Sequence, residues 1–172
     1  MKKIILLGYM SSGKTEIGKL LAKKLDLPFY DLDHLIENEE QKSVTEIFND
    51  RGEIYFRKRE HEIFKQQVEK QEEFILSLGG GAPCYANNHL FLQNEDVLSV
   101  FLKASVETLV ERLKTGKKQR PLIANLNDEE LAEYIAKHLF DRNYYYNHSK
   151  KTVVVDGKSP LDVVEEITKQ LA

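Results

Sequence analysis

The stretch Gly8-Tyr9-Met10-Ser11-Ser12-Gly13-Lys14-Thr15 directly follows the apolar run Ile4-Ile5-Leu6-Leu7. It matches the pattern G-x-x-x-x-G-K-[ST], in which a glycine-rich loop surrounds phosphate groups. The apolar run predicts a buried strand, and apolar residues three or four apart over 16–25 predict an amphipathic helix. A strand, a glycine loop and a helix in this order direct backbone N–H groups toward a bound phosphate. This context favours a site for ATP or GTP over a chance match in a Gly/Ser-rich turn.

The residue types in this loop suit a phosphate site. Gly8 and Gly13 allow backbone angles and close approaches that a side chain would block. We expect the Lys14 ammonium to contact the β- and γ-phosphates and the Thr15 hydroxyl to ligate Mg²⁺. The loop residues expected to contact ATP are Ser11, Ser12, Gly13, Lys14 and Thr15.

Length and composition predict one ordinary globular domain over 1–172, because two domains would be cramped in 172 residues. A hydrophobic content of 41% and a charged content of 31% are typical of soluble proteins. The net charge of -3 argues against a broad nucleic-acid-binding surface. No apolar stretch is long enough for a membrane span, and we expect no secretion signal. The single cysteine, Cys84, has no internal disulfide partner, which fits a reducing cytoplasm.

Strand and helix patterns alternate along the chain and predict a mostly parallel sheet covered by helices on both faces. Beyond the first strand, we expect strands over 27–31, 74–78, 96–102 and 151–155. We expect helices over 16–25, 32–40, 44–50, 53–70, 106–113, 128–146 and 160–171. Ligands of such sheets gather beyond the carboxyl ends of the strands. The segments that follow the strands, including 8–15, 31–33, 79–81 and 156–160, should therefore converge on one cleft.

Asp31 and Asp33 stand at the end of the second expected strand. In strand geometry, residues two apart point to the same side, which would turn both carboxylates toward the phosphate site. Asp33 could instead cap the helix that follows. Beside a phosphate-binding loop, we favour the functional interpretation, with one carboxylate near Mg²⁺ and the other near the acceptor hydroxyl.

Several later residues could bind an anionic acceptor. Arg57 follows Phe56, whose side chain should point inward. The planar guanidinium of an arginine suits a carboxylate or a phosphate. The usual alternative for such a run is a solvated charged face. Gly79-Gly80-Gly81 ends an apolar strand, and three glycines indicate a ligand against the backbone more than a simple turn. Arg142, before three consecutive tyrosines, would add a second positive group. The five histidines lack metal-ligand spacing, and Cys84 is expected to be an incidental thiol.

The segment 114–127 has little periodicity and carries Lys117, Lys118, Arg120 and Pro121. A basic loop after a nucleotide-binding fold can close over the phosphates, bring an arginine to the transferring group and exclude water. From composition alone, a solvated loop is an equal alternative.

Taken in order, these motifs closely resemble those of shikimate kinases over essentially the whole chain. The phosphate loop is generic, whereas the later elements are much more specific. The motifs are Asp31-x-Asp33, Gly52-Glu53-x-x-Phe56-Arg57-x-x-Glu60, Ser77-Leu78-Gly79-Gly80-Gly81-Ala82, Arg120-Pro121-Leu122 and Arg142-x-x-x-Tyr146.

The resemblance implies ATP-dependent phosphorylation of the 3-hydroxyl of shikimate, in aromatic amino-acid biosynthesis. It implies a P-loop, nucleoside-monophosphate-kinase-like α/β fold with a five-stranded parallel sheet, an acceptor-binding segment at about 32–71 and a mobile lid at about 114–127. A cytoplasmic monomer with Mg²⁺ as cofactor, and with no nucleic-acid or membrane partner, is expected.

The resemblance also implies roles for single residues. Lys14 contacts the transferring phosphate, Thr15 holds Mg²⁺ and Asp31 supports the metal, through water. Asp33 binds the acceptor hydroxyls and orients or deprotonates the attacking one. The remaining roles are the shikimate carboxylate clamp (Arg57 and Arg142), the backbone against the ring (Gly79, Gly80 and Gly81), the lid arginine on the ATP phosphates (Arg120) and a weaker adenine-side candidate (Lys158).

Two positions depart from the family pattern: Ser11 replaces a usual glycine, and Tyr144 replaces a frequent proline. Among rival functions, a GTP-regulated switch lacks its Asp-x-x-Gly and Asn-Lys-x-Asp motifs. A zinc-bearing nucleotide-kinase lid lacks its cysteines and histidines. A gluconate kinase is the alternative enzyme of the same fold. An inactive ATP-binding protein would be expected to have lost Lys14, Asp33 or one of the paired arginines.

Overall fold

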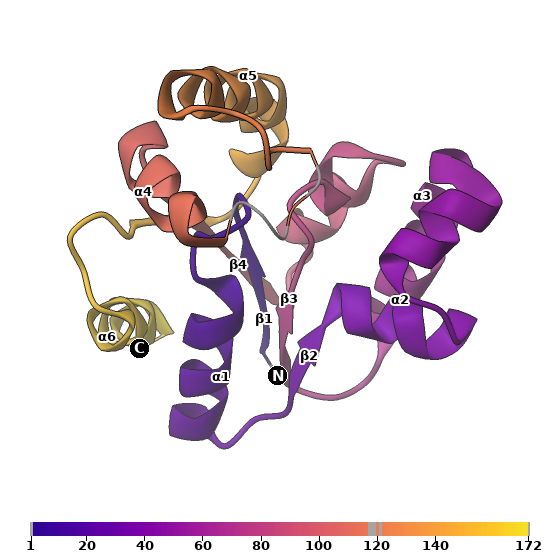
Figure 1. Ribbon diagram of the computed structural model, residues 1–172. Helices are drawn as coiled ribbons and strands as arrows, with labels where there is room; N and C mark the ends of the chain where they lie inside the picture. The colour runs from indigo at the N-terminus through magenta and orange to yellow at the C-terminus, as the bar shows by residue number, and fades with distance from the viewer. Residues whose placement is uncertain (1, 117–119, 121, 172) are drawn as a thin grey trace.

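The computed structural model describes residues 2–116, 120 and 122–171. Five parallel strands of these residues form one sheet in the order β2-β3-β1-β4-β5 (Figure 1). The strands are β1 (Lys3–Leu7), β2 (Phe29–Asp31), β3 (Phe74–Ser77), β4 (Val97–Lys103) and β5 (Lys151–Val154). The predicted five-stranded parallel sheet is confirmed, and the strand that leads into the phosphate loop lies at its centre.

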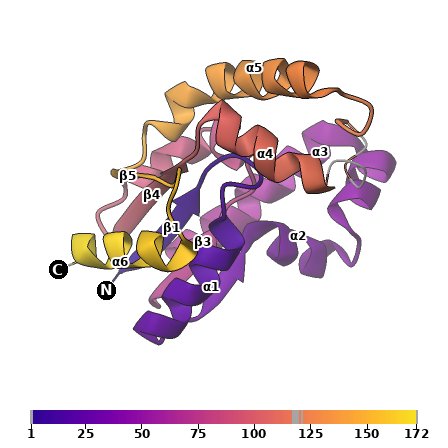
Figure 2. The same ribbon diagram turned by 60° about the vertical axis from the view of Figure 1, so that its left-hand side comes forward.

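Helices cover both faces of this sheet, as the alternating pattern predicted. They are α1 (Lys14–Leu25), α2 (Leu32–Glu40), α3 (Val44–Glu69), α4 (Val106–Gly116), α5 (Asp128–Tyr146) and α6 (Pro160–Leu171). Two short 3-10 helices, η1 (Ala82–Cys84) and η2 (Asn88–Gln93), lie between β3 and β4. In Figures 1 and 2, α1 and α6 pack side by side, and α5 lies across the end of the sheet beside α4.

The central strand divides its side chains between two hydrophobic cores. Ile4 and Leu6 belong to the core formed with α1, α4, α5 and α6, whereas Ile5 and Leu7 belong to the core formed with α2 and α3. All four side chains are buried. A strand covered on both faces has no solvent-facing side, which explains why the sequence there is continuously apolar rather than alternating.

A kink at Gly52 divides α3 into two parts, and the second part carries Arg57 to the glycine turn. Gly52 has φ 86° and ψ 171°, a conformation that favours glycine, so the sequence-based division into helices over 44–50 and 53–70 corresponds to a real break. After the kink, Phe56 is buried in the core and Arg57 lies at the turn that follows β3. The first part of α3 starts at a capping box in which Ser43 and Glu46 satisfy each other's backbone N–H groups.

The expected lid is described only in part. Helix α4 continues to Gly116, past the predicted end at Leu113. Lys117, Lys118 and Pro121 lie outside the described residues, whereas Arg120 is described. None of the described helices is long and apolar enough to cross a membrane.

Candidate active site

The phosphate loop connects the end of β1 to the start of α1, and its backbone requires its glycines. Gly8 has φ 152°, and a Cβ placed there would lie 2.7 Å from the carbonyl oxygen of Leu102 on β4. Gly13 has φ 100°. Ser11, which replaces a glycine of the family pattern, also occupies the left-handed region, with φ 66°. This conformation costs a residue with a Cβ about 1 kcal/mol or more, so the loop holds Ser11 under strain.

The Lys14 side chain folds back over the loop that carries it. Its Nζ donates hydrogen bonds to the carbonyl oxygens of Gly8 and Tyr9, at 2.7 Å and 2.9 Å. Burial lowers the pKa of this amine to about 8, although the nearby carboxylates of Asp33 and Asp31 oppose the shift. The amine is therefore enclosed by the loop and lies within the field of both aspartates.

The two aspartates at the end of β2 occupy different positions. Asp31 is the N-cap of α2, and its Oδ1 accepts a hydrogen bond from the backbone N–H of His34 at 3.3 Å. Asp33 lies in the first turn of that helix, so the alternative that Asp33 is the cap is wrong. Burial, followed by the charges of Asp31 and Glu37, raises the pKa of Asp33, and Lys14 and Arg57 oppose that rise. A partly desolvated carboxylate beside the phosphate-loop lysine suits proton transfer better than helix capping.

Each glycine of the turn after β3 faces a different charged side chain. A Cβ on Gly79 would lie 3.1 Å from Asp33 Oδ1, and one on Gly80 would lie 3.0 Å from Arg142 Nη1. A Cβ on Gly81 would lie 2.8 Å from Arg57 Nη2. The absence of a Cβ at these glycines makes room for the three charged side chains, and the predicted contact of a ligand with the glycine backbone stays a prediction. Asp33, Arg57 and Arg142 are thus brought together, as predicted, around one turn.

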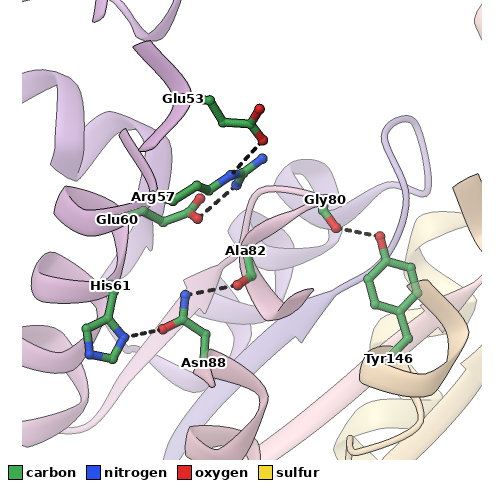
Figure 3. Close-up of polar contacts among 8 residues, drawn as sticks. All are labelled: Glu53, Arg57, Glu60, His61, Gly80, Ala82, Asn88 and Tyr146. Atoms are coloured by element: carbon green, nitrogen blue, oxygen red, sulfur yellow. Dashed lines mark hydrogen bonds and ion pairs between the residues drawn. The ribbon is translucent and has the colours of Figure 1, made fainter. Parts of the chain in front are cut away.

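Arg57 is held by a buried carboxylate on its own helix (Figure 3). Its Nη1 donates to Glu60 Oε1 at 2.8 Å, and the Glu60 side chain is only 1% exposed. Burial raises the pKa of Glu60, and the charge of Arg57 counteracts the rise. Glu53 lies farther away, with 3.9 Å between its Oε1 and Arg57 Nε. The aromatic ring of Tyr85 covers the guanidinium, with its centroid 4.0 Å from Arg57 Cζ.

Arg142 and Tyr146 extend from α5 to the same glycine turn. The Arg142 Cζ lies 5.5 Å from the ring centroid of Tyr9, and the Tyr146 hydroxyl donates to the carbonyl oxygen of Gly80 at 2.6 Å (Figure 3). Burial raises the pKa of Tyr146 to about 12, so this hydroxyl keeps its proton at neutral pH. Helix α5 therefore contacts the phosphate loop and the glycine turn together.

A cavity borders the phosphate loop between α1, α4 and the start of α6. It has a volume of about 500 Å³, and Lys158 lies in its wall, where its Nζ forms a 2.7 Å ion pair with Glu166. Arg112 of α4 lines the same cavity and donates to the carbonyl oxygen of Ser11 at 3.0 Å. Arg112 is not among the residues predicted from the sequence, because one arginine on an amphipathic helix carries no local signal. The cavity walls comprise Ser11, Ser12, Gly13, Glu16, Ile17, Arg112, Val155, Lys158, Pro160 and Val163.

Arg120 lies against the phosphate loop, and its predicted contact with the ATP phosphates stays a prediction. Its Nη1 approaches the sulfur of Met10 at 3.6 Å, and its charge affects both Tyr9 and Lys14. Thus the described part of the segment 114–127 places a cation beside the loop.

The residues expected to hold Mg²⁺ fit a hard cation. The Thr15 side chain and the Asp31 carboxylate line one groove beside the loop. Hydroxyl and carboxylate oxygens are the donors that Mg²⁺ prefers, and this ion usually takes only one or two protein ligands beside phosphates and water. No cluster of three metal-binding side chains occurs among the described residues.

Cys84 lies close to the site but is not reactive by itself. Burial raises the pKa of its thiol to about 11, despite the nearby Arg142 and Arg57. The thiolate is the nucleophilic form of cysteine, so the protonated side chain is inert at neutral pH. This agrees with the expectation of an incidental thiol.

Comparisons with known proteins agree with this geometry. The family model described as shikimate kinase matches residues 10–172. A shikimate kinase from Flavobacterium psychrophilum is 63% identical over 99% of both chains. The solved structure of a shikimate kinase from Acinetobacter baumannii in complex with shikimate has a TM-score of 0.86 and 29% identity. It covers 99% of this chain and 93% of that chain.

The chain also resembles a gluconokinase from Sinorhizobium meliloti, with a TM-score of 0.59. That structure is 18% identical and covers 99% of this chain and 91% of the other. Similarity at this level shows a shared fold alone.

Proposed function

The chain belongs to the shikimate kinase family and is a kinase that transfers phosphate from ATP to shikimate, and from that premise we propose how its own residues divide the reaction. The observation that carries the proposal is the turn Gly79-Gly80-Gly81, against which one carboxylate and two guanidinium groups lie. An acceptor with a carboxylate and hydroxyl groups matches that set of charges. The gluconate kinase alternative is not favoured, because the gluconokinase likeness is confined to the fold.

Arg57 and Arg142 hold the shikimate carboxylate in this proposal. They lie against adjacent glycines, so their guanidinium groups flank one turn from two different helices. A planar guanidinium suits a carboxylate because its N–H groups form paired, charge-assisted hydrogen bonds. Fixing the acid end of the substrate in this way places its ring along the glycine backbone.

Asp33 receives the hydroxyl that attacks the phosphate. Its half-buried carboxylate lies against Gly79 of the glycine turn, and its raised pKa favours acceptance of a proton. We propose that it binds the 3-hydroxyl of shikimate and takes its proton as the hydroxyl oxygen bonds to the γ-phosphorus of ATP and the bond from that phosphorus to the departing ADP breaks. Since phosphoryl transfer requires little covalent assistance, the orientation of this hydroxyl is the main contribution.

Lys14 and Arg120 stabilise the negative charge on the phosphate that moves. Lys14 exchanges its two loop carbonyl partners for phosphate oxygens, and Arg120 approaches from the lid. The backbone of Ser11, Ser12 and Gly13 lies along the phosphates. Thr15 and Asp31 would hold Mg²⁺, which supplies charge neutralisation on the phosphate oxygens when it is bound. Arg112 and Lys158 border the cavity that we assign to the nucleoside end of ATP.

We propose further that the enzyme acts as a cytoplasmic monomer in aromatic amino-acid biosynthesis. Residues 1–172 then form one domain, in which the segment at about 32–71 binds the acceptor and the segment at about 114–127 is a mobile lid. The segment 32–71 corresponds to α2 and α3, and Arg57 lies on α3.

The experiment that tests this function measures ADP release from ATP and Mg²⁺, with and without shikimate. Gluconate and AMP serve as control acceptors. We expect release that depends on shikimate alone. If ATP binds but shikimate does not stimulate release, the phosphate site remains and the assignment of the acceptor pocket fails.

A further inference from the structure

The guanidinium group of Arg57 has only one close polar partner among the described residues. Glu60 accepts a hydrogen bond from Nη1, whereas Glu53 remains 3.9 Å from Nε. The buried Nε finds no hydrogen-bond acceptor in the described part of the chain. A single hydrogen bond leaves a guanidinium free to pivot about it. Another contact must fix the plane in which Arg57 meets a carboxylate.

The ring of Tyr85 supplies that contact. Its centroid lies 4.0 Å from Arg57 Cζ, closer than the 5.2 Å that separates Cζ from the Phe56 ring. The Tyr85 residue is 39% exposed, so it does not belong to the hydrophobic core. A cation over an aromatic face is attracted to it at this distance. The Tyr85 ring thus lies over the guanidinium, and Nη1 and Nη2 of that group lie beside Gly81.

The turn that carries Tyr85 is strained and firmly anchored. Ala86 and Asn87 both adopt left-handed backbone angles, with φ 52° and 58°. Asparagine tolerates this region, whereas alanine does not favour it. Such strain persists where the surrounding structure enforces it, and it is found most often at functional sites. The turn that holds Tyr85 over Arg57 is therefore a constrained segment and not a relaxed surface loop.

Asn88 is the anchor of this turn (Figure 3). It is fully buried; its Nδ2 donates to the carbonyl oxygen of Ala82 at 2.9 Å, and its Oδ1 accepts from His61 Nδ1 at 2.6 Å. The backbone N–H of Asn88 also donates to the carbonyl oxygen of Tyr85 at 2.9 Å. His61 and Arg57 lie on the same helix, so α3 holds both the arginine and the turn whose tyrosine covers it.

We propose that Tyr85 is a positioning residue for the substrate carboxylate. Its aromatic ring keeps the Arg57 guanidinium in one plane, so that a carboxylate meets the N–H edge and not the face. The role belongs to the ring and not to the hydroxyl. This inference rests on the proposed role of Arg57 as a carboxylate ligand.

The test is a double-mutant cycle between Tyr85 and Arg57. Steady-state kinetics with ATP, Mg²⁺ and shikimate are measured for the wild type, Tyr85→Leu, Arg57→Ala and the double variant. We expect Tyr85→Leu to raise the KM for shikimate about three- to tenfold, while the KM for ATP stays within about twofold. In the Arg57→Ala background, the same substitution should change the shikimate KM by less than about twofold.

Two further variants separate the ring from the hydroxyl and from general surface effects. Tyr85→Phe keeps the ring and should stay within about twofold of the wild type. Tyr144→Leu removes a more exposed tyrosine, 66% exposed, that contacts Tyr145 and His148, and it should leave the shikimate KM unchanged. Thermal unfolding of each variant verifies that the chain remains folded.

Shikimate methyl ester adds a readout that a purely structural role would not change. The ester lacks the anionic carboxylate, so Tyr85→Leu should reduce the preference for shikimate over the ester. An equal loss for both acceptors, or an equal effect of Tyr85→Leu with and without Arg57, overturns the role of Tyr85. If Arg57→Ala itself leaves the shikimate KM unchanged, the assignment of Arg57 fails first. The two failures are therefore distinguishable.

Discussion

The Tyr9 hydroxyl lies 2.8 Å from Nδ1 of His138 and thereby joins the phosphate loop to the middle of α5. Tyr9 is 1% exposed, and burial raises the pKa of its hydroxyl well above the usual range. Burial, together with the charge of Arg142, lowers the pKa of His138. Both groups are thus held in their neutral forms, joined by a hydrogen bond between segments 129 residues apart.

Removing this hydroxyl should loosen the connection. We expect Tyr9→Phe to lower the free energy of unfolding by about 1 kcal/mol, because it deletes one hydrogen bond and leaves the His138 nitrogen without this partner. Urea denaturation measures the change. Tyr144→Phe, at an exposed position, is the matched control and should change stability by less than about 0.5 kcal/mol. A loss in the control equal to that of Tyr9→Phe would contradict the importance of the Tyr9–His138 contact.

Acidification should destabilise the enzyme from about pH 6.5 downward. The pKa values of His138 and His89 are both lowered from 6.5 in the folded protein, chiefly by burial. As the pH falls, these histidines therefore bind protons in the unfolded chain before they do so in the folded protein. Their contribution to stability is fully present above pH 6.5 and is lost as the pH falls through their pKa values in the folded protein. Urea midpoints between pH 7.5 and 5.5 should show this decline. A His89→Gln/His138→Gln double variant should flatten the profile in that interval; an unchanged slope would assign the effect to other groups.

ATP use should weaken above about pH 8. The pKa of Lys14 is lowered to about 8, so its ammonium loses its proton as the pH rises through that value. A neutral amine attracts phosphate oxygens less, and kcat/KM for ATP should decline by up to about tenfold per pH unit. The Lys14→Arg variant keeps its positive charge over pH 7–9.5. It should be less active than the wild type, and its kcat/KM for ATP should stay constant over that range. The same decline in Lys14→Arg would remove Lys14 as its cause.

Asp33→Asn should reduce kcat at least about 100-fold, while the KM for ATP changes less than about threefold, because the variant loses the proton acceptor but not the phosphate loop. Steady-state kinetics with saturating shikimate measure this change. Asp31→Asn is the informative comparison, because it should instead raise the Mg²⁺ concentration required for half-maximal rate. Full turnover by Asp33→Asn would exclude this carboxylate from the reaction.

Two glycine substitutions should affect different properties, one the binding of shikimate and the other the stability of the fold. In Gly81→Ala the new Cβ would meet the end of the flexible Arg57 side chain, which can move, so we expect a shikimate KM about tenfold higher with little change in Tm. In Gly18→Ala the Cβ would lie 2.3 Å from the Phe29 ring, so stability should fall by about 1–3 kcal/mol. Thermal unfolding and shikimate kinetics on both variants provide the comparison. Equal losses of stability would show that Gly81 serves the fold and not the site.

Local patterns explain which features of this chain were predictable. The phosphate loop, the continuous apolar strand before it and the break at Gly52 are each encoded within a few consecutive residues. The sites of Arg57, Arg142 and Arg120 followed from a family resemblance, and the structure brings all three to the loop and the glycine turn. Roles of single residues remain predictions until they are measured.

Contacts between distant segments explain what was missed. The choice of Asp31 over Asp33 as helix cap depends on where β2 ends, which a pattern locates only to within a few residues. Arg112 contacts Ser11 across 101 residues, and Tyr85 reaches Arg57 through a left-handed turn that contains no glycine. The glycine triplet is visible in the sequence, but its three side-chain neighbours come from three separate helices.

Helix α5 connects the phosphate loop with the glycine turn through side chains at regular intervals. His138, Arg142 and Tyr146 follow one another at intervals of four residues along this helix. His138 contacts the phosphate loop, and Tyr146 contacts the glycine turn. Arg142, between them, contacts both. A helix advances about 1.5 Å and rotates about 100° per residue, so one inserted residue would turn the later contacts away from the earlier one. The spacing between the phosphate loop and the glycine turn thus depends on the rise and rotation of α5.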